Sequence, residues 1–360
     1  MNNSLYNKES ILQSSTWGML EILRNLTAEE QFTFASSCKT LWNFIIQYIQ
    51  IEHKTNLLDI ESCDLINNAT DLYMTIMPII SRISININGS FNNRDMSYKK
   101  IANVTKLCLD LEINRKIDIS DVWGLTNLTQ LELTVYKNNI TDISPITQLI
   151  NLTQLTLRLG SNEITSISPI GQFTNFTELY IDIQCTYITD ISPISQLTNL
   201  TQLYLNLGCN RISNISPIGQ LTKLTQLDLN LEDTIIIDIT SIGQLTKLTQ
   251  LDLNLNFTKI TNMSPISQLT NLTGFHLQLM KVEIENISFI TQLTNLIELD
   301  IFLRDSEIID ISPIGQLTNL TKVSLQDYIG YYDKRELEKL SNIENLEKTL
   351  GIRVGEYYTP

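Results

Sequence analysis

Three side chains that could do chemistry lie at even intervals along this chain. Asp252, His276 and Asp300 are 24 residues apart (276 − 252 and 300 − 276). An imidazole between two carboxylates can bind a metal ion or exchange a proton with a substrate. Cys185 and Cys209 are separated by the same interval, and two neighbouring thiols can close into a disulfide. Whether any of these groups meet depends on the structure that repeats every 24 residues.

The 24-residue interval belongs to a sequence repeat. The tetrapeptide ISPI, or a close variant, begins at Ile143, Ile167, Ile191, Ile215, Ile239, Met263, Ile287 and Ile311. Nine clean units run from 104 to 319, an outlying copy occupies 80–87, and half of another unit follows at 320–325. A fixed period of this length is typical of a solenoid, in which each unit stacks on the next.

Each unit carries one apolar pattern. With Leu128 and its equivalents as position 1, apolar side chains recur at positions 1, 4, 6, 8, 13, 16, 19 and 22, and positions 3, 5 and 7 are mostly polar. This alternation predicts a strand with one buried side. Asn or Thr at position 11 is expected to bond the following turn, and Ser-Pro to begin the back segment with Ser as its N-cap. That segment of about six residues is too short for a full helix, so we expect a shallow arc.

The segment LTNLTQLELTV…NNITDISPI (125–146) shows the unit in full. It resembles the leucine-rich repeat of the internalin type, although an extra inward residue at position 8 displaces the Asn by two places. The resemblance implies an α/β solenoid: a leucine-rich-repeat arc with a parallel β-sheet on the concave face and short turns or 3-10 segments on the convex face. We expect repeats over 80–326 and a C-terminal cap over 327–360, in which a helix ends at Gly351 and a last strand follows at 352–354.

Composition and charge narrow the kinds of partner. The formal charge of −14 and a pI near 4.6 disfavour nucleic acid and anionic membrane surfaces. Without a signal-peptide run or a transmembrane stretch, we expect a cytoplasmic or nuclear protein. The five cysteines are an odd number, and Cys185 and Cys209 are expected to be free thiols there. The abundance of Ile and Asn is typical of an AT-rich coding genome, such as that of a protist or a large DNA virus.

Recognisable catalytic motifs do not occur in the sequence. It contains no Gly-rich phosphate loop, no HExxH and no Ser or Cys nucleophile in a familiar setting. We therefore expect no enzyme activity, no cofactor and no metal. Stacked units bring any residues 24 apart into line, so Asp252, His276 and Asp300 are interpreted as a solvated binding surface.

The outward positions of the strands are the expected binding face. Tyr180 and Tyr204 fall on neighbouring units, and aromatic anchors on a rigid surface are typical of protein recognition. We expect a neutral to basic protein partner and a chain that is monomeric by itself; the alternative is that these positions are polar only for solubility. The candidate residues are Glu132, Arg158, Tyr180, Asp182, Tyr204, Asp228, Asp252, His276, Asp300 and Phe302.

The amino-terminal part carries a second pattern. The stretch WGMLEILRNLTAEEQFTFASSCKTLWNFI (17–45) contains short amphipathic runs with more apolar residues than so small a unit can bury. It resembles the F-box, a helical motif that binds Skp1 and links a substrate receptor to a cullin ubiquitin ligase, although Gly18 and Met19 stand where that family usually has Leu-Pro. The matching residues are Ile22, Leu23, Leu26, Phe32, Phe34, Cys38 and Trp42.

This resemblance suggests a domain order. A polar tail at 1–15 precedes the F-box-like segment at 16–50, and a helical linker at 51–79 leads into the repeats. The order implies a substrate receptor that presents a target to the ligase. The alternative is a leucine-rich-repeat binding scaffold without a ubiquitin role, whose amino-terminal helices only seal the solenoid.

Overall fold

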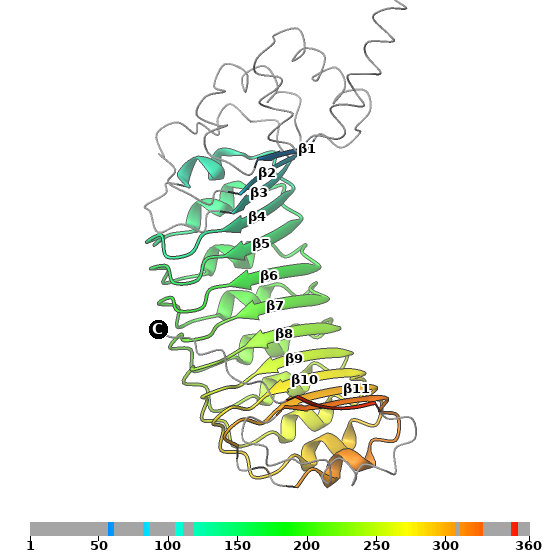
Figure 1. Cartoon of the computed structure of the whole chain (residues 1–360). Coiled ribbons are helices and arrows are strands. Elements are labelled where there is room, and N and C mark those ends of the chain that lie inside the picture. Colours follow the sequence, from blue (N-terminus) through cyan, green and yellow to red (C-terminus); the bar gives the residue numbers. More distant parts are fainter. Residues whose placement is uncertain are drawn as a thin grey trace, which may run out of the picture.

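A computed structural model describes residues 57–60, 82–86, 105–110, 119–306, 308, 310–326 and 347–351. They form one sheet of 13 parallel strands in chain order, stacked as rungs with 3-10 turns behind them (Figure 1). The strands are β1 (Leu57–Ile60), β2 (Arg82–Asn86), β3 (Lys106–Asp110), β4 (Gln130–Thr134), β5 (Gln154–Arg158), β6 (Glu178–Asp182), β7 (Gln202–Asn206), β8 (Gln226–Asn230), β9 (Gln250–Asn254), β10 (Gly274–Gln278), β11 (Glu298–Phe302), β12 (Lys322–Gln326) and β13 (Glu347–Gly351).

The register of the sheet repeats the sequence period. From β2 to β11, every paired residue has its partner in the next strand 24 places later, as in Tyr180 with Tyr204 and His276 with Asp300. Strands β2 and β12 lie at the outlying copy near 80–87 and at the half unit of 320–325, and both continue the 24-residue register. The stack bends only gently (Figure 1). The expected leucine-rich-repeat solenoid is therefore confirmed.

The core runs the length of the stack as one cluster. In the unit that begins at Leu152, all eight predicted apolar positions are buried, and Leu159 at position 8 is fully so. The regular strand ends at position 7, but the ladder continues: the Leu159 N–H donates to the Asp182 carbonyl at 2.7 Å. The extra inward residue thus extends the pairing of the rungs beyond the strand.

Buried side chains at position 11 hold the turns, as predicted. The Asn162 amide nitrogen donates to the Val135 and Leu159 carbonyls at 2.6 and 2.9 Å, and its oxygen accepts from the Asn138 N–H at 2.9 Å. Thr234 reaches only its own rung, donating to the Leu231 carbonyl at 2.7 Å. Position 11 therefore satisfies backbone groups that water cannot reach.

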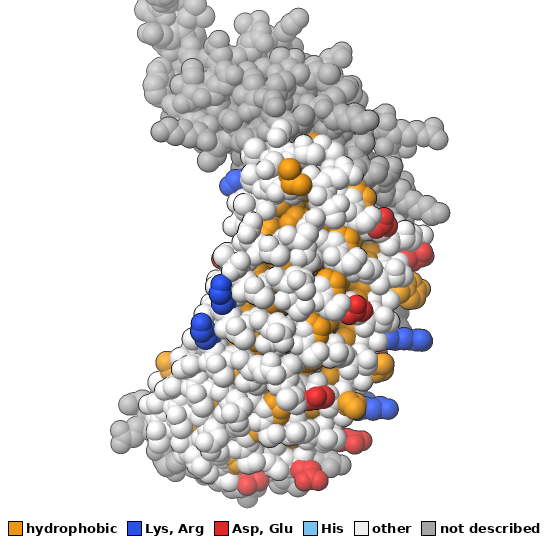
Figure 2. All heavy atoms as spheres, turned by 180° about the vertical axis from the view of Figure 1, so that it is seen from behind, with side chains coloured by type: hydrophobic (Ala, Val, Ile, Leu, Met, Phe, Trp, Pro, Cys, Tyr) orange, Lys and Arg blue, Asp and Glu red, His pale blue; other side chains and the backbone are white. Residues whose placement is uncertain are grey.

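The back of each rung is a five-residue 3-10 helix. Those of the described units are η2 (Ser120–Gly124), η3 (Ser144–Gln148), η4 (Ser168–Gln172), η5 (Ser192–Gln196), η6 (Ser216–Gln220), η7 (Thr240–Gln244), η8 (Ser264–Gln268), η9 (Ser288–Gln292) and η10 (Ser312–Gln316). From behind, this side is mostly uncharged, and many of its charged side chains lie toward the edges (Figure 2).

The capping group of these helices differs from the expectation. Ser144 is the first residue inside η3, and its N–H and hydroxyl both donate to the Asp142 carboxylate at 2.7 Å. Asp190 and Asp310 do the same for Ser192 and Ser312. A carboxylate two residues upstream reaches the exposed N–H through an Asx turn, which leaves no capping role for Ser.

Both ends of the sheet depart from the expected helices. Strand β1 lies within 51–79, which was expected to be helical, and it pairs with β2. Strand β13 ends at Gly351, where a helix was expected to stop, and it occupies 347–351 instead of the expected 352–354. In both places the open edge of a sheet is paired with one more strand. The segment 16–50 and its seven candidate Skp1-binding residues lie outside the described part of the chain.

Candidate binding face

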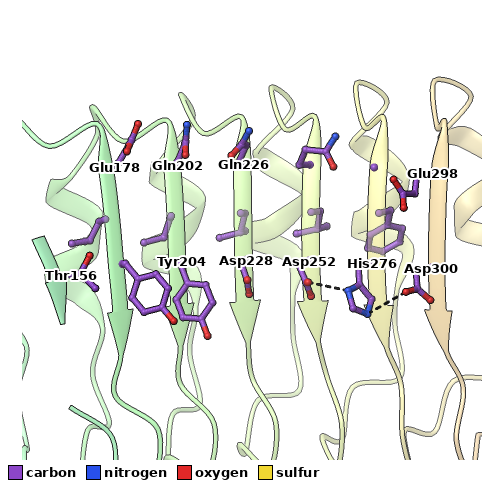
Figure 3. A pocket seen from close by; sticks show the side chains of 18 of the residues that line it. Thr156, Glu178, Gln202, Tyr204, Gln226, Asp228, Asp252, His276, Glu298 and Asp300 are labelled. Carbon is purple, nitrogen blue, oxygen red and sulfur yellow. Dashed lines mark ion pairs between the residues drawn. The ribbon is translucent and has the colours of Figure 1, made fainter. Parts of the chain in front are cut away.

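Outward side chains of β4 to β11 form one continuous face, which we call the strand face. Position 5 of each rung lies at its centre, in line from Thr156 to Asp300 (Figure 3). Position 3 adds a second row, mainly Gln and Glu, beside a hollow of about 670 Å³ that spans β5 to β11. The parallel register alone produces this alignment, because every strand presents equivalent positions at the same height.

The aromatic end of the strand face is built on β5, β6 and β7. The rings of Tyr180 and Tyr204 are stacked with centroids 3.8 Å apart and planes at 3°. The Arg158 guanidinium lies 4.4 Å from the centroid of the Tyr180 ring and is held by Glu132, 2.6 Å from it. Burial in this stack, followed by the hydrogen bond with Tyr180, raises the pKa of Tyr204. The result is a rigid platform with both an apolar surface and hydrogen-bonding groups.

The acidic end of the strand face is built on β8 to β11. His276 Nδ1 lies 3.0 Å from the Asp252 carboxylate, and Nε2 lies 3.9 Å from that of Asp300 (Figure 3). The hydrogen bond to Asp252 raises the pKa of His276, although partial burial opposes the shift. Burial and the neighbouring charge of Asp252 raise the pKa of Asp228 to about 6. This end therefore changes its charge in the range in which imidazoles titrate.

One expected binding residue has another role. Asp182, at position 7, is 5% exposed. Its carboxylate accepts the Gln184 N–H at 3.1 Å and the Tyr136 hydroxyl at 2.9 Å. Asn206 is also buried at this position and accepts the Gly208 N–H at 3.1 Å. The Asp182 and Asn206 side chains thus bond the turn that follows their strand, so Asp182 is not open to a partner.

The other candidate residues do come together. Glu132, Arg158 and the two tyrosines form one connected group, and Asp228, Asp252, His276 and Asp300 continue the same line. Phe302, at position 7 of β11, is half-buried beside them. Among the residues with described side chains, no group of three or more His, Cys, Asp or Glu is placed to hold a metal ion.

Two features of the face escaped the sequence analysis. Tyr136 lies outside the strand, yet its ring approaches Gly160 so closely that a Cβ there would lie 2.9 Å from Cε1. Gly274 stands at position 3, where the other strands of the hollow have Gln or Glu, and Gln250 leans into the space: a Cβ on Gly274 would lie 2.0 Å from its side-chain oxygen. The glycine among the Gln and Glu residues at position 3 was the sequence signal for this close approach.

Comparisons with known proteins agree with the repeat. The model of the family "Leucine Rich repeats (2 copies)" matches residues 180–218. No curated protein matches the sequence. Among the described residues, no helix has the length and hydropathy needed to span a membrane.

Solved structures extend the similarity over most of the chain. An internalin, InlF, of Listeria monocytogenes is 26% identical over 76% of this chain and 88% of its own, with a TM-score of 0.55. Internalin C2 of the same organism is 30% identical over 54% of this chain and 79% of its own, with a TM-score of 0.44. A leucine-rich-repeat protein of Leptospira interrogans is 20% identical over 81% and 88%, with a TM-score of 0.50. The 24-residue rungs, the matching repeat model and the similarity to an internalin structure together show that this chain folds as a leucine-rich-repeat solenoid.

Proposed function

We propose that this chain is a non-catalytic scaffold that binds a protein partner on its strand face. The fold supports a role as a protein-binding scaffold, because leucine-rich-repeat proteins are typically protein-interaction modules. The observation that supports the strand face as the binding surface is the Tyr180–Tyr204 stack beside the hollow. Preorganised aromatic side chains next to a recess supply contact area at little entropic cost, as binding hot spots do.

The negative charge of the strand face favours a partner segment that carries positive charge. Asp252 and Asp300 lie on either side of one imidazole, and Asp228 adjoins Asp252. A chain of formal charge −14 also offers little to attract an acidic protein. A complementary segment therefore carries Lys or Arg near an apolar residue, so that the cation faces the carboxylates and the apolar group covers the tyrosines.

Selection from a displayed random-peptide library tests this proposal. Peptides bound by the full-length chain should be enriched in Lys or Arg with a neighbouring apolar residue. Tyr204→Ala should weaken the selected peptides about tenfold or more in fluorescence anisotropy. Tyr187→Ala is the matched control, because Tyr187 is 67% exposed on a turn away from the strand face. Equal losses in the two variants would place the binding surface elsewhere.

The acidic end has its own test. Asp252→Asn should weaken the same peptides several-fold and reduce the dependence of affinity on salt, because one partner charge loses its counterpart. Glu163→Gln removes an equal charge at an exposed position outside the strands and serves as the control. Unchanged salt dependence in Asp252→Asn would contradict a basic partner.

As a second candidate function, we propose that the chain is a substrate receptor of a Skp1–cullin ubiquitin ligase and acts in the cytoplasm or nucleus. It is supported by the F-box-like spacing of Leu23, Leu26 and Trp42 ahead of the repeats. The full-length chain should co-purify with Skp1, and Leu23→Ala with Leu26→Ala should abolish this binding while circular dichroism of the repeats stays unchanged. Failure of the full-length chain to bind Skp1 would leave the scaffold without a ubiquitin role as the better description, and retained Skp1 affinity in the double variant would contradict binding through these two leucines.

A further inference from the structure

Two cysteines occupy one position on neighbouring rungs. Cys185 follows β6 and Cys209 follows β7, both at position 10, and both are exposed, free thiols, as the sequence predicts. Among the described units, the other residues at this position are Lys137, Ser161, Asp233, Phe257, Lys281 and Asp305. The pair is therefore not a requirement of the repeat.

The backbone holds the two residues in matching geometry. The Cys185 N–H donates to the Gly208 carbonyl at 2.8 Å, and the Cys209 N–H donates to the Glu232 carbonyl at 2.8 Å, so the ladder continues through both. Their φ angles are 53° and 58°, in the left-handed region. Equal conformation in equal register gives parallel Cα–Cβ bonds and a Cα separation of about 4.8 Å, within the range that disulfides span.

The environment of the pair differs between the two thiols. Partial burial raises the pKa of Cys209 to about 12, helped by the hydrogen bond and charge of Cys185 and by Asp233. Cys209 consequently carries little thiolate while Cys185 is free. A first attack by Cys185 bonds its sulfur to another group and so removes the charge that opposes ionisation of Cys209.

We propose that Cys185 and Cys209 form a paired-thiol modification site that reacts with a low-molecular-weight disulfide and closes into a reversible cross-rung disulfide. The Cys185 thiolate attacks one sulfur of the small disulfide, forming a mixed disulfide and releasing one small thiolate. The Cys209 thiolate then attacks the Cys185 sulfur and releases the second. Two protein thiols are oxidised, one external disulfide is reduced to two thiols, and the two protons pass to those products.

Reversibility follows from the spacing of the rungs. Parallel Cβ atoms lie about 4.8 Å apart, whereas a relaxed disulfide brings them to about 3.8 Å. The two turns must move together against their continuous backbone hydrogen bonds, so the closed form is strained and easily reduced. A small dithiol should therefore reopen it without denaturant.

The test uses the folded, full-length protein and oxidised glutathione. Trypsin cleaves after Arg158 and Arg211, which leaves both cysteines on one peptide. After oxidation and alkylation, that peptide should lose two hydrogen masses and carry neither glutathione nor alkyl group, and dithiothreitol should restore both alkylation sites. Accumulation of glutathione on Cys185 or Cys209 without closure, or absence of any reaction there, would overturn the proposal.

Two double variants test the rung geometry. Cys209→Ser with Ser161→Cys moves the pair by one rung and should close as the wild type does. Cys209→Ser with Asp233→Cys places the thiols two rungs apart, about 9.6 Å, and should stop at the mixed disulfide. All three positions share the left-handed backbone, so unequal strain at the turn is not a variable. Closure of the separated pair at the wild-type rate would show that turn motion, not the ladder, brings the thiols together.

Discussion

The two sides of the same strands follow different rules. In β7, Leu203 and Leu205 are 2% and 0% exposed, while Tyr204 between them lies on the strand face. From β4 to β11 the inward residues are all Leu, Ile or Phe. Position 5 reads Glu, Thr, Tyr, Tyr, Asp, Asp, His and Asp over the same strands. The inward side fixes the spacing of the rungs, and the outward side is free to vary within that spacing.

Truncating one residue on each side of β7 should show the largest contrast. Leu205→Ala leaves a cavity in the continuous core and should lower the free energy of unfolding by about 3 kcal/mol. Tyr204→Ala loses mainly the ring stacking, which is worth about 1 kcal/mol. Urea unfolding followed by circular dichroism measures both. Comparable losses would mean that the strand face contributes to stability as the core does.

The buried polar side chains at position 11 should also contribute more to stability than the residues of the strand face. Asn210 donates to the Ile183 and Leu207 carbonyls at 2.8 and 3.0 Å and accepts the Thr186 N–H at 3.0 Å. Asn210→Ala leaves these groups buried without partners and should cost about 2 kcal/mol. Asn210→Thr should cost about half as much, because Thr234 and Thr258 keep one of these bonds in their own rungs. If Ala and Thr are equivalent in urea unfolding, the link between rungs carries the whole effect.

Removing a carboxylate from the strand face should raise the stability of the folded chain, unlike the substitutions in the core and in the turns. The pKa of Asp228 is raised to about 6 in the folded chain, so ionisation is disfavoured there. Wild-type stability is therefore fully present below the ordinary carboxyl pKa of about 3.9 and is partly lost as the pH rises through 6. Asp228→Asn should stabilise the chain by on the order of 1 kcal/mol at pH 8, with no effect at pH 3.5. A pH-independent difference in melting temperature would contradict this origin.

The smallest effect concerns the proposed partner. As the pH falls from 8 to 5, Asp228 loses a negative charge and His276 gains a positive one, because both pKa values are raised. Affinity for a basic peptide selected on the strand face should fall several-fold over this range. His276→Gln with Asp228→Asn should flatten the profile in fluorescence anisotropy. A profile of unchanged steepness would assign the titration to the peptide.

Sequence alone predicts most of this fold because inward residues stack on copies of themselves. Leu179 and Leu203 needed only the period and the alternation to be placed, and so did the line from Asp228 to Asp300. The period also gives the neighbourhood of Tyr180 and Tyr204. It does not give their 3.8 Å stacking, which depends on side-chain rotamers and on Arg158.

Other features depend on competition between local hydrogen bonds. Ser144 and Asp142 are both good caps by type, and the carboxylate prevails because it reaches the free N–H from two residues upstream. Asp182 alternates with apolar residues as an exposed side chain does, yet the turn after β6 takes its carboxylate. The predictions for the two ends of the sheet were wrong for a different reason. No neighbouring copy of the repeat fixes the register of β1 or β13, whose pairings are offset by 25 residues (82 − 57 and 347 − 322).

The constant register gives the side chains of the strand face a fixed spacing, which differs from the spacing of side chains along an extended peptide. Rungs recur about every 4.8 Å, whereas side chains on one face of an extended peptide recur about every 6.7 Å. Because the two spacings are unequal, the side chains of an extended peptide lying across the rungs would coincide with the side chains of the strand face only at some rungs. The three intervals between rungs from Tyr204 to His276 span about 14 Å, close to four residues of extended chain. An extended peptide bound across the strand face as proposed should therefore place its two anchor side chains four residues apart.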